Sequence, residues 1–199
     1  MPPRHPPDPD ALVFRPATPA RWPDVERLFG PRGACGGCWC MFWKQTSAQY
    51  REGKGARNRR ALRRIVRSGA VPGLLAYAGR QPVGWVAVEP RAHYARLGRS
   101  RTLAPVDDQA VWSVPCFFVA RGWRHRGIAG RILAAAADHA RRRGARILEG
   151  YPVDSSGRLA DAWLYHGSAS TFVRLGFREV TRRARTRPVM RLSLARSRR

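Results

Sequence analysis

The sequence predicts a single domain of the α/β (α+β) class, and three observations lead to this prediction. The chain has 199 residues, a length that suits one domain built around one hydrophobic core. Apolar residues make up 44% of it and aromatic residues recur along it, which argues against a disordered chain. Residues 111–119 are β-branched and aromatic, and a turn with glycines joins them to an alanine-rich stretch that ends at Gly144. The second half therefore contains a strand, a turn and a helix in direct succession.

The first elements follow a proline-rich start. Residues 1–10 contain five prolines and little apolar surface, so we expect a tail in solvent. Residues 11–15 can form a short strand. A helix that begins near Thr18 or Pro23 should end at Gly30, because proline suits the first helical turn and glycine the position after the last.

The middle of the chain predicts helices and then a hairpin. Residues 47–67 form a helical stretch that Ser47 can cap, with a break at residues 53–55, where two glycines stand. Residues 74–78 and 83–88 read as the two strands of a β-hairpin around a glycine turn. A loop or short helix should follow over residues 91–108.

The C-terminal part predicts three more strands and one short helix. Residues 147–153 supply a strand, and residues 168–175 supply a helix closed by a glycine. Residues 177–180 and 188–194 supply the last two strands. Residues 195–199 resemble the N-terminal tail and carry basic side chains, so the domain should span residues 11–194, without a linker or repeat.

The formal net charge of +25 admits two interpretations. Clustered basic residues favour a nucleic-acid partner, and the arginines between Arg57 and Arg67 could form such a surface. However, of the 38 basic residues only Lys44 and Lys54 are lysines, a bias typical of GC-rich coding sequences. A nucleic-acid partner is therefore not favoured, and the same positive field would suit a cofactor that carries phosphates.

Composition also predicts where the protein resides. No stretch approaches the about 20 apolar residues that span a bilayer, and the N-terminus lacks the apolar run of a secretion signal. Four cysteines in a chain of this length do not make a secreted disulfide framework. We expect a cytoplasmic protein with reduced thiols, without a membrane partner, as a monomer or homodimer.

The segment between strand 111–119 and the alanine-rich helix has the residue types that an anion requires. A helix N-terminus presents unpaired N–H groups and a partial positive charge, so a phosphate placed there gains hydrogen bonds. Gly127, Ala129 and Gly130 allow close approach, and Arg124, Arg126 and Arg131 add charge. An ordinary glycine turn before a helix would show part of the same pattern.

Arg124-x-x-Gly127-x-Ala129 resembles the acetyl-CoA signature of the GNAT acetyltransferase superfamily, (Gln/Arg)-x-x-Gly-x-(Gly/Ala). The order of the elements is similar as well, most clearly from residue 111 onward. The resemblance implies the GNAT fold: a mixed, mostly antiparallel sheet of about six to seven strands, splayed between strands 4 and 5 and flanked by about four helices. It also implies acetyl-CoA as cosubstrate.

The resemblance further implies which residues bind acetyl-CoA. Pantetheine should lie along the strand residues Phe117, Phe118 and Val119. The pyrophosphate should lie against a turn formed by Arg124, Arg126, Gly127, Ile128, Ala129, Gly130 and Arg131. The amine should meet the thioester in the cleft between the splayed strands.

Two positions depart from the family pattern for proton transfer. Some relatives place a glutamate where this chain has Pro115, and many place a tyrosine where it has Phe172. Glu149 on the next strand is the candidate base, ahead of Glu89 and Asp154. Tyr165 and His166 are the candidate acids, the alternative being protonation of the thiolate by water.

The stretch from Cys35 to Trp43 holds three cysteines and three large aromatic residues. Cys35 and Cys38 have zinc-ligand spacing, but no second such pair appears, so we expect packed thiols and no metal. Family members shape the acceptor pocket in this region, so Trp39, Phe42 and Trp43 are candidate substrate-binding residues. Large aromatic residues at such spacing also occur in cores.

These observations favour an N-acyltransferase that transfers an acetyl group from acetyl-CoA to a primary amine of a small molecule, by direct attack in a ternary complex. A peptide amine is a second acceptor class. Two alternatives come from other classes: an acyl-CoA-binding sensor without catalysis, and a basic nucleic-acid-associated protein.

Overall fold

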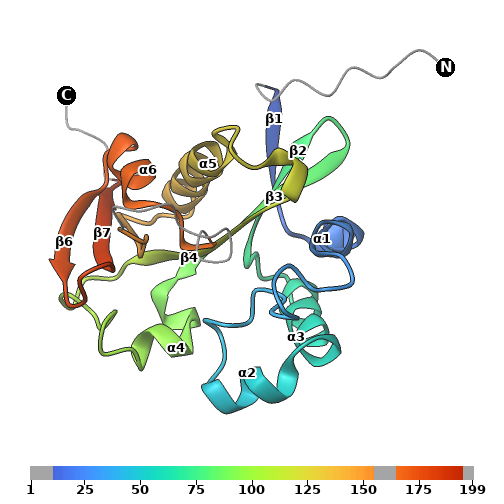
Figure 1. The fold of residues 1–199 in the computed structure, drawn as a ribbon, viewed down its shortest axis with the longest axis horizontal. Coiled ribbons are helices and arrows are strands. Elements are labelled where there is room, and N and C mark those ends of the chain that lie inside the picture. The colour runs from blue at the N-terminus through green and yellow to red at the C-terminus, as the bar shows by residue number, and fades with distance from the viewer. Residues whose placement is uncertain (1–10, 155–164, 195–199) are drawn as a thin grey trace.

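The computed structural model of the protein describes residues 11–154 and 165–194 (Figure 1). Its strands are Leu12–Pro16 (β1), Gly73–Ala78 (β2), Gln81–Pro90 (β3), Trp112–Val119 (β4), Ile147–Gly150 (β5), Arg178–Arg182 (β6) and Pro188–Ser193 (β7). They form one sheet in the order β1-β2-β3-β4-β5-β7-β6. Only β4 and β5 pair in parallel, which confirms the predicted mixed, mostly antiparallel sheet. The two predicted tails lie outside the described residues.

The sheet opens between β4 and β5. Parallel pairing joins residues 112–114 of β4 to residues 148–150 of β5 and stops there. β4 continues to Val119, whereas β5 ends at Gly150. Pro115 and Pro152 follow the last pair on the two strands, and neither has an N–H to extend the ladder. The expected splay between strands 4 and 5 is confirmed, and the strand predicted to reach residue 153 is three residues shorter.

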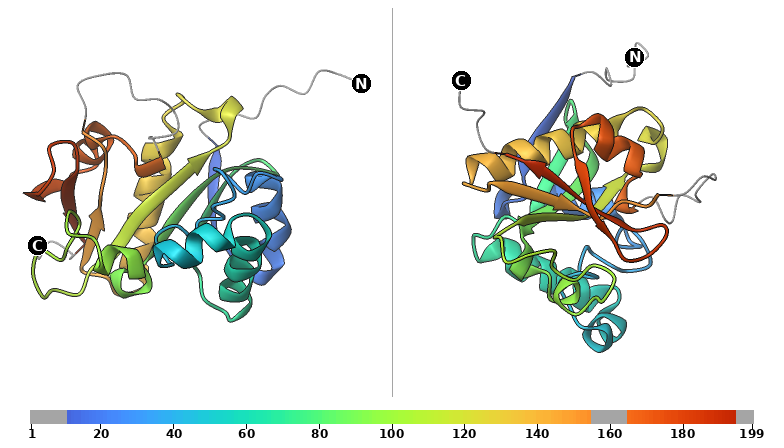
Figure 2. Two further views of the ribbon diagram at one scale, coloured as in Figure 1. Left: turned by 60° about the horizontal axis from the view of Figure 1, so that its bottom comes forward. Right: turned by 90° about the vertical axis from the view of Figure 1, so that its left-hand side faces the viewer.

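Helices cover both faces of the sheet (Figures 1 and 2). The α-helices are Trp22–Phe29 (α1), Ser47–Gly53 (α2), Ala56–Arg67 (α3), Ala95–Gly98 (α4), Ile128–Arg142 (α5) and Ala169–Arg174 (α6). Short 3-10 turns are Pro19–Arg21 (η1), Arg91–His93 (η2) and Arg121–Trp123 (η3). Helices α5 and α6 lie on one face, and α1 to α4 lie on the other.

Helix α5 packs closely on the sheet because its buried side is built from small and branched residues. Ile132, Leu133 and Ala136 are fully buried in one core cluster with Val86 of β3. Gly84 of β3 lies directly beneath this helix, where a Cβ atom would come within 2.4 Å of the Ile132 Cδ1 atom. The glycine lets the Ile132 side chain lie directly on the strand.

The opposite face holds a second, more aromatic cluster. Helix α1 contributes Trp22, Val25 and Phe29, and β3 contributes Trp85. The predicted break between α2 and α3 lies at Gly55, whose φ of 80° ends the first helix and starts the second.

The cap of helix α2 differs by one residue from the expectation. Thr46, not Ser47, accepts a hydrogen bond from the Gln49 N–H at 3.3 Å, and the Gln49 side chain accepts in return from the Thr46 N–H. Ser47 is therefore the first residue of the helix. Across residues 11–154 and 165–194 the helices are too short or too polar to cross a bilayer.

Candidate active site

A left-handed turn connects the free end of β4 to helix α5. Gly127 caps the helix with a φ of 72° and a ψ of 0°, and His125 also has a positive φ, 60°. A Cβ atom at Gly127 would meet no atom within 4 Å, so space outside the turn is open. Backbone conformation, rather than crowding, requires glycine at this position.

The first turn of α5 leaves backbone donors for an anion. Gly130 and Arg131 both donate their N–H groups to the Gly127 carbonyl, at 3.1 and 3.4 Å. The N–H groups of Gly127, Ile128 and Ala129 precede the first helical bond and have no carbonyl in a preceding turn. These three N–H groups, from the cap residue and the first two residues of α5, are therefore available to an anion.

Positive charge surrounds this turn. Arg124 donates from Nε to the Val119 carbonyl at 3.1 Å, which ties the turn to the end of β4. The Arg126 guanidinium lies over the Trp123 ring, 5.4 Å from its centroid. No aspartate or glutamate occurs in the sequence between residues 109 and 137. The residue types therefore fit a diphosphate, as the sequence predicts.

Strand β4 presents backbone groups to the opening of the sheet. The Ala120 N–H donates to the Val83 carbonyl on β3 at 2.9 Å. Because hydrogen-bonding directions alternate along an antiparallel strand, Phe118 also bonds toward β3, whereas Phe117 and Val119 face the opening. The opening therefore offers N–H groups where a thioester carbonyl would need a donor.

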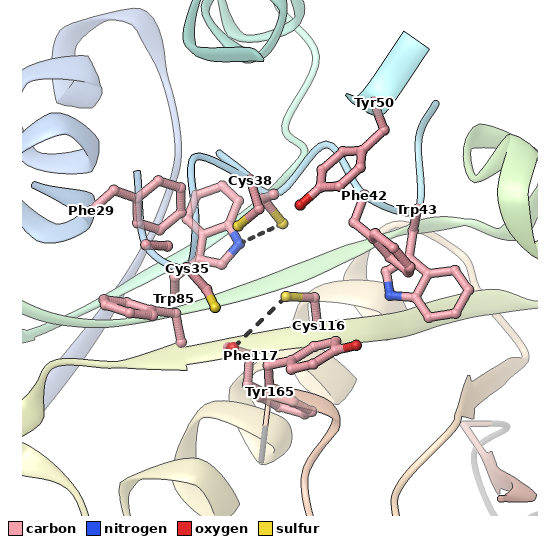
Figure 3. A pocket seen from close by; sticks show the side chains of 13 residues that line it. Phe29, Cys35, Cys38, Phe42, Trp43, Tyr50, Trp85, Cys116, Phe117 and Tyr165 are labelled. Carbon is pink, nitrogen blue, oxygen red and sulfur yellow. Dashed lines mark hydrogen bonds between the residues drawn. The ribbon is translucent and has the colours of Figure 1, made fainter. Parts of the chain in front are cut away.

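A cavity of about 190 Å3 lies beside β4, on the face covered by α1 and α2 (Figure 3). Its wall is aromatic and thiol-rich, with little polar surface. The lining residues are Phe29, Ala34, Cys35, Cys38, Cys40, Phe42, Trp43, Tyr50, Trp85, Cys116, Phe117, Phe118 and Tyr165. Two of the three predicted acceptor residues, Phe42 and Trp43, thus line a cavity.

The third predicted acceptor residue, Trp39, is placed in the core. It packs against Trp22 and Phe29, with ring centroids 6.2 and 5.6 Å apart, and is buried. The loop before it is held by Asn58 of α3, whose Nδ2 donates to the Gly37 carbonyl at 3.2 Å. Spacing along the chain could not show this, because Trp39 and Cys40 both have positive φ angles, which turn the chain before Phe42.

Tyr165 and His166 come directly after residues 155–164, and both lie beside β4. Tyr165 lines the cavity, and burial raises the pKa of its hydroxyl. His166 is buried, and its Nδ1 donates to the Pro115 carbonyl at 3.0 Å. Burial, helped by the charge of Arg187, lowers the pKa of His166 to about 3. The imidazole is therefore neutral at physiological pH.

Trp43 presents a buried donor at the same place. Its ring meets the His166 ring edge-on, with centroids 5.6 Å apart. Its Nε1 is buried and has no hydrogen-bond partner among the described residues. Figure 3 shows this nitrogen directed toward Cys116 and Tyr165, into the cavity. A buried donor without a partner costs free energy, so a ligand that accepts this hydrogen bond would be favoured.

Glu149, the candidate base, lies in an ion-pair cluster. Its Oε1 accepts from Arg91 Nη1 at 2.8 Å and from the Tyr151 hydroxyl at 2.6 Å. Its Oε2 accepts from Arg191 Nε at 2.8 Å. The side chain is 1% exposed and does not line the cavity. Glu89, the weaker candidate, is likewise buried and paired, with Lys44 and His93.

All four cysteines are free and line the cavity. Cys40 is buried, and the Trp85 Nε1 donates to its sulfur at 3.1 Å. The pKa of Cys40 is lowered, chiefly by a hydrogen bond from Cys116 and to a smaller extent by the bond from Trp85. Within residues 11–154 and 165–194, no group of three His, Cys, Asp or Glu side chains could hold a metal ion.

Phe172, where many relatives carry tyrosine, belongs to the core of the α5 face. It is completely buried against the rings of Phe117 and Phe177. Gly150 lies so close that a Cβ atom there would be 2.1 Å from the Phe172 Cε1 atom. A hydroxyl group would have no room to reach the cavity from this packing.

Sequence reasoning missed part of the cavity wall. Tyr50, Trp85 and Phe29 come from three separate elements, and only their aromatic character marked them in advance. Cys116 of β4 also lies on the cavity wall.

The open sheet, the basic left-handed turn and the adjoining cavity together define an acetyltransferase-type fold. The model of the acetyltransferase (GNAT) family matches residues 39–160, more than half of the chain. The chain therefore belongs to the GNAT acetyltransferase family. No curated protein matches it.

Solved structures share the fold at low sequence identity. A candidate GNAT acetyltransferase from Desulfovibrio desulfuricans is 18% identical, with a TM-score of 0.55 over 93% of this chain and 100% of the other. The PaiA N-acetyltransferase from Thermoplasma acidophilum, solved with coenzyme A, is 11% identical, with a TM-score of 0.53 over 92% and 99%. The yncA candidate acetyltransferase from Salmonella typhimurium, solved with acetyl-CoA, is 15% identical, with a TM-score of 0.50 over 95% and 97%.

Proposed function

We propose that this protein transfers an acetyl group from acetyl-CoA to a primary amine of a small molecule, by direct attack within a ternary complex. The observation that carries the proposal is the Gly127 turn that follows the free end of β4, together with an aromatic cavity lined by Phe117 and Phe118 of the same strand. The turn suits the pyrophosphate, and the cavity suits an acceptor. Two solved structures of the same fold contain coenzyme A or acetyl-CoA, which supports acetyl-CoA as the cosubstrate.

The reaction would use the opening of the sheet. The amine nitrogen attacks the thioester carbon, a C–N bond forms, and the C–S bond breaks with its electron pair leaving on sulfur. The N–H groups of Phe117 and Val119 are the donors we assign to the carbonyl oxygen, because both face the opening. The nitrogen gives one proton to water after the attack. The thiolate gains one from water, or from Tyr165, which then regains its proton from solvent.

Tyr165 is the better of the two predicted acids. Its raised pKa keeps the hydroxyl protonated, and it lines the cavity. His166 is neutral, and its Nδ1–H already donates to the Pro115 carbonyl. We therefore propose that His166 positions β4 where this strand parts from β5. For Glu149 we propose a structural role, because three donors already occupy its carboxylate.

Calorimetric titration with acetyl-CoA tests the cosubstrate. We expect micromolar binding by the wild type and loss of binding in Gly127→Glu, because the carboxylate would project into the open space at the turn. Gly122→Ala is the matched control, since a Cβ atom there also meets no atom within 4 Å and its φ is not positive. Absence of binding by the wild type would refute the proposal. Binding without turnover over a broad amine panel would instead indicate an acyl-CoA sensor.

A further inference from the structure

The size of the aromatic cavity limits what it can hold. An apolar cavity of roughly 150 Å3 accepts one benzene molecule in another protein. The present cavity, at about 190 Å3, is therefore large enough for one six-membered ring with a small substituent. Aromatic rings from Phe29, Phe42, Trp85 and Phe118 form much of its wall (Figure 3). Edge and face contacts with these rings favour an aromatic guest.

The charge around the cavity disfavours a protonated amine. None of the described lining residues is an aspartate or glutamate. The buried carboxylate of Glu89, whose charge is felt at Cys40, is already paired with Lys44 and His93. The net charge of +25 adds an unfavourable field for a cation. An alkylammonium would thus enter without a counter-ion.

Among the described lining residues there is also no carboxylate or imidazole that would deprotonate the acceptor. Burial raises the pKa of Tyr50 to about 12 and raises that of Tyr165, so both hydroxyls are donors at neutral pH. Acyl transfer requires a neutral amine nitrogen. An amine attached directly to an aromatic ring is neutral at pH 7 because its lone pair is delocalised, so it needs no base before it attacks.

The Trp43 N–H is a buried donor at this wall that has no hydrogen-bond partner among the described residues. It is directed into the cavity (Figure 3). A guest ring that carries an oxygen acceptor would satisfy it. The position of this donor, away from the polar solvent, would make the hydrogen bond selective for ligands that bring an acceptor.

We propose that the acceptor is a weakly basic aromatic amine with a single ring and an oxygen substituent that accepts a hydrogen bond from Trp43. This inference rests on the proposed acetyltransferase function and specifies its substrate class. Size, aromatic wall, absence of a carboxylate and the unpartnered donor all select the same kind of molecule.

Three amines of similar size test the protonation state. Aniline is neutral at pH 7, whereas benzylamine and cyclohexylamine are cations. With saturating acetyl-CoA, we expect kcat/KM for aniline to exceed both others at least tenfold at pH 7 and to stay flat between about pH 6 and pH 8. The rates for the two alkylamines should rise about tenfold per pH unit, following the neutral fraction. Because aromatic faces also attract cations, preference for benzylamine is a real alternative, and it would overturn the inference.

Two variants test the place of binding. We expect the wild type to bind 4-aminoacetophenone about fivefold or more tightly than aniline. Trp43→Phe keeps a ring but removes the N–H, so this advantage in the dissociation constant should disappear. Cys116→Leu fills the cavity from β4 and should abolish aniline binding, measured by equilibrium dialysis without acetyl-CoA. Acetyl-CoA binding by both variants verifies that they fold. An unchanged 4-aminoacetophenone advantage in Trp43→Phe would overturn the assignment of this donor.

The two proposals fail in different ways. Loss of all acetyl-CoA binding in the wild type would remove the acetyltransferase proposal. Intact acetyl-CoA binding, with turnover of benzylamine in preference to aniline, would leave that proposal standing and remove only the aromatic-amine inference.

Discussion

The imidazole of His166 and the carbonyl of Pro115 meet at the point where β4 parts from β5, with 3.0 Å between Nδ1 and oxygen. Strand separation would leave this carbonyl without a ladder partner, and the histidine supplies one from another part of the chain. The opening of the sheet is thus stabilised by a side chain. Burial and the charge of Arg187, rather than this hydrogen bond, keep the imidazole neutral.

Stability should therefore depend on pH through His166. Its pKa is about 3 in the folded protein and lies near its ordinary value of about 6.5 once unfolded. The unfolded chain binds the proton first, so the contribution of His166 is complete above about pH 6.5 and is lost as the pH falls toward 3. His166→Asn should flatten this part of the profile in urea unfolding. His139, whose pKa burial also lowers, should keep a smaller slope. An unchanged profile would contradict the assignment.

Glu149→Gln should cost stability rather than catalysis. The substitution leaves Arg91 without its carboxylate partner and Arg191 with Asp107 alone, so we expect the free energy of unfolding to drop by about 3 kcal/mol. The kcat of the folded fraction should stay within about twofold. Glu179→Gln, which breaks an exposed pair with Arg182, is the control and should cost under about 1 kcal/mol. A large fall in kcat with normal stability would restore Glu149 as the base.

Phe172→Tyr tests whether the family's tyrosine position can be refilled. The ring is packed against Gly150 and Phe117, so the new hydroxyl would be buried without a designed partner. We expect a loss of about 1–3 kcal/mol of stability and no increase in kcat. Thermal unfolding and steady-state kinetics measure the two effects. A rise in kcat would show that a hydroxyl at this position reaches the leaving thiolate.

Modification of Cys35 should block the cavity. This thiol is exposed, whereas Cys40 is buried, so a bulky maleimide should react with Cys35 first. The adduct would stand at the cavity wall and should abolish turnover while acetyl-CoA binding persists. Cys35→Ser should protect the activity, and mass spectrometry of peptides identifies the modified residue. Inhibition that persists in Cys35→Ser would place the sensitive thiol elsewhere.

The sequence predicted the elements best where chemistry is local. The strand, turn and helix around Gly127 follow from residue types within one segment, and β4 and α5 lie within a few residues of their predicted bounds. The break between α2 and α3 could also be predicted, because two glycines stand at residues 53–55 and Gly55 adopts a positive φ.

Contacts between distant segments could not be predicted from the sequence. The partners of Glu149 are Arg91 and Arg191, 58 and 42 residues away, and nothing in the local pattern marks them. Trp39 and Trp43 look equivalent in the sequence, yet one packs into the core and the other lines the cavity. The reason is the course of the loop, which depends on tertiary hydrogen bonds such as that from Asn58.

The near absence of lysine has a chemical consequence for a protein that handles an activated acyl donor. Thioesters acylate amines slowly without an enzyme, but the guanidinium of arginine is always protonated and is not a nucleophile under these conditions. Lys44 is buried and paired with Glu89, so it is shielded. Lys54 is then the exposed lysine side chain open to adventitious acetylation. The charge of the surface thus persists through long exposure to the protein's own cosubstrate, because it rests almost entirely on groups that the reagent cannot modify.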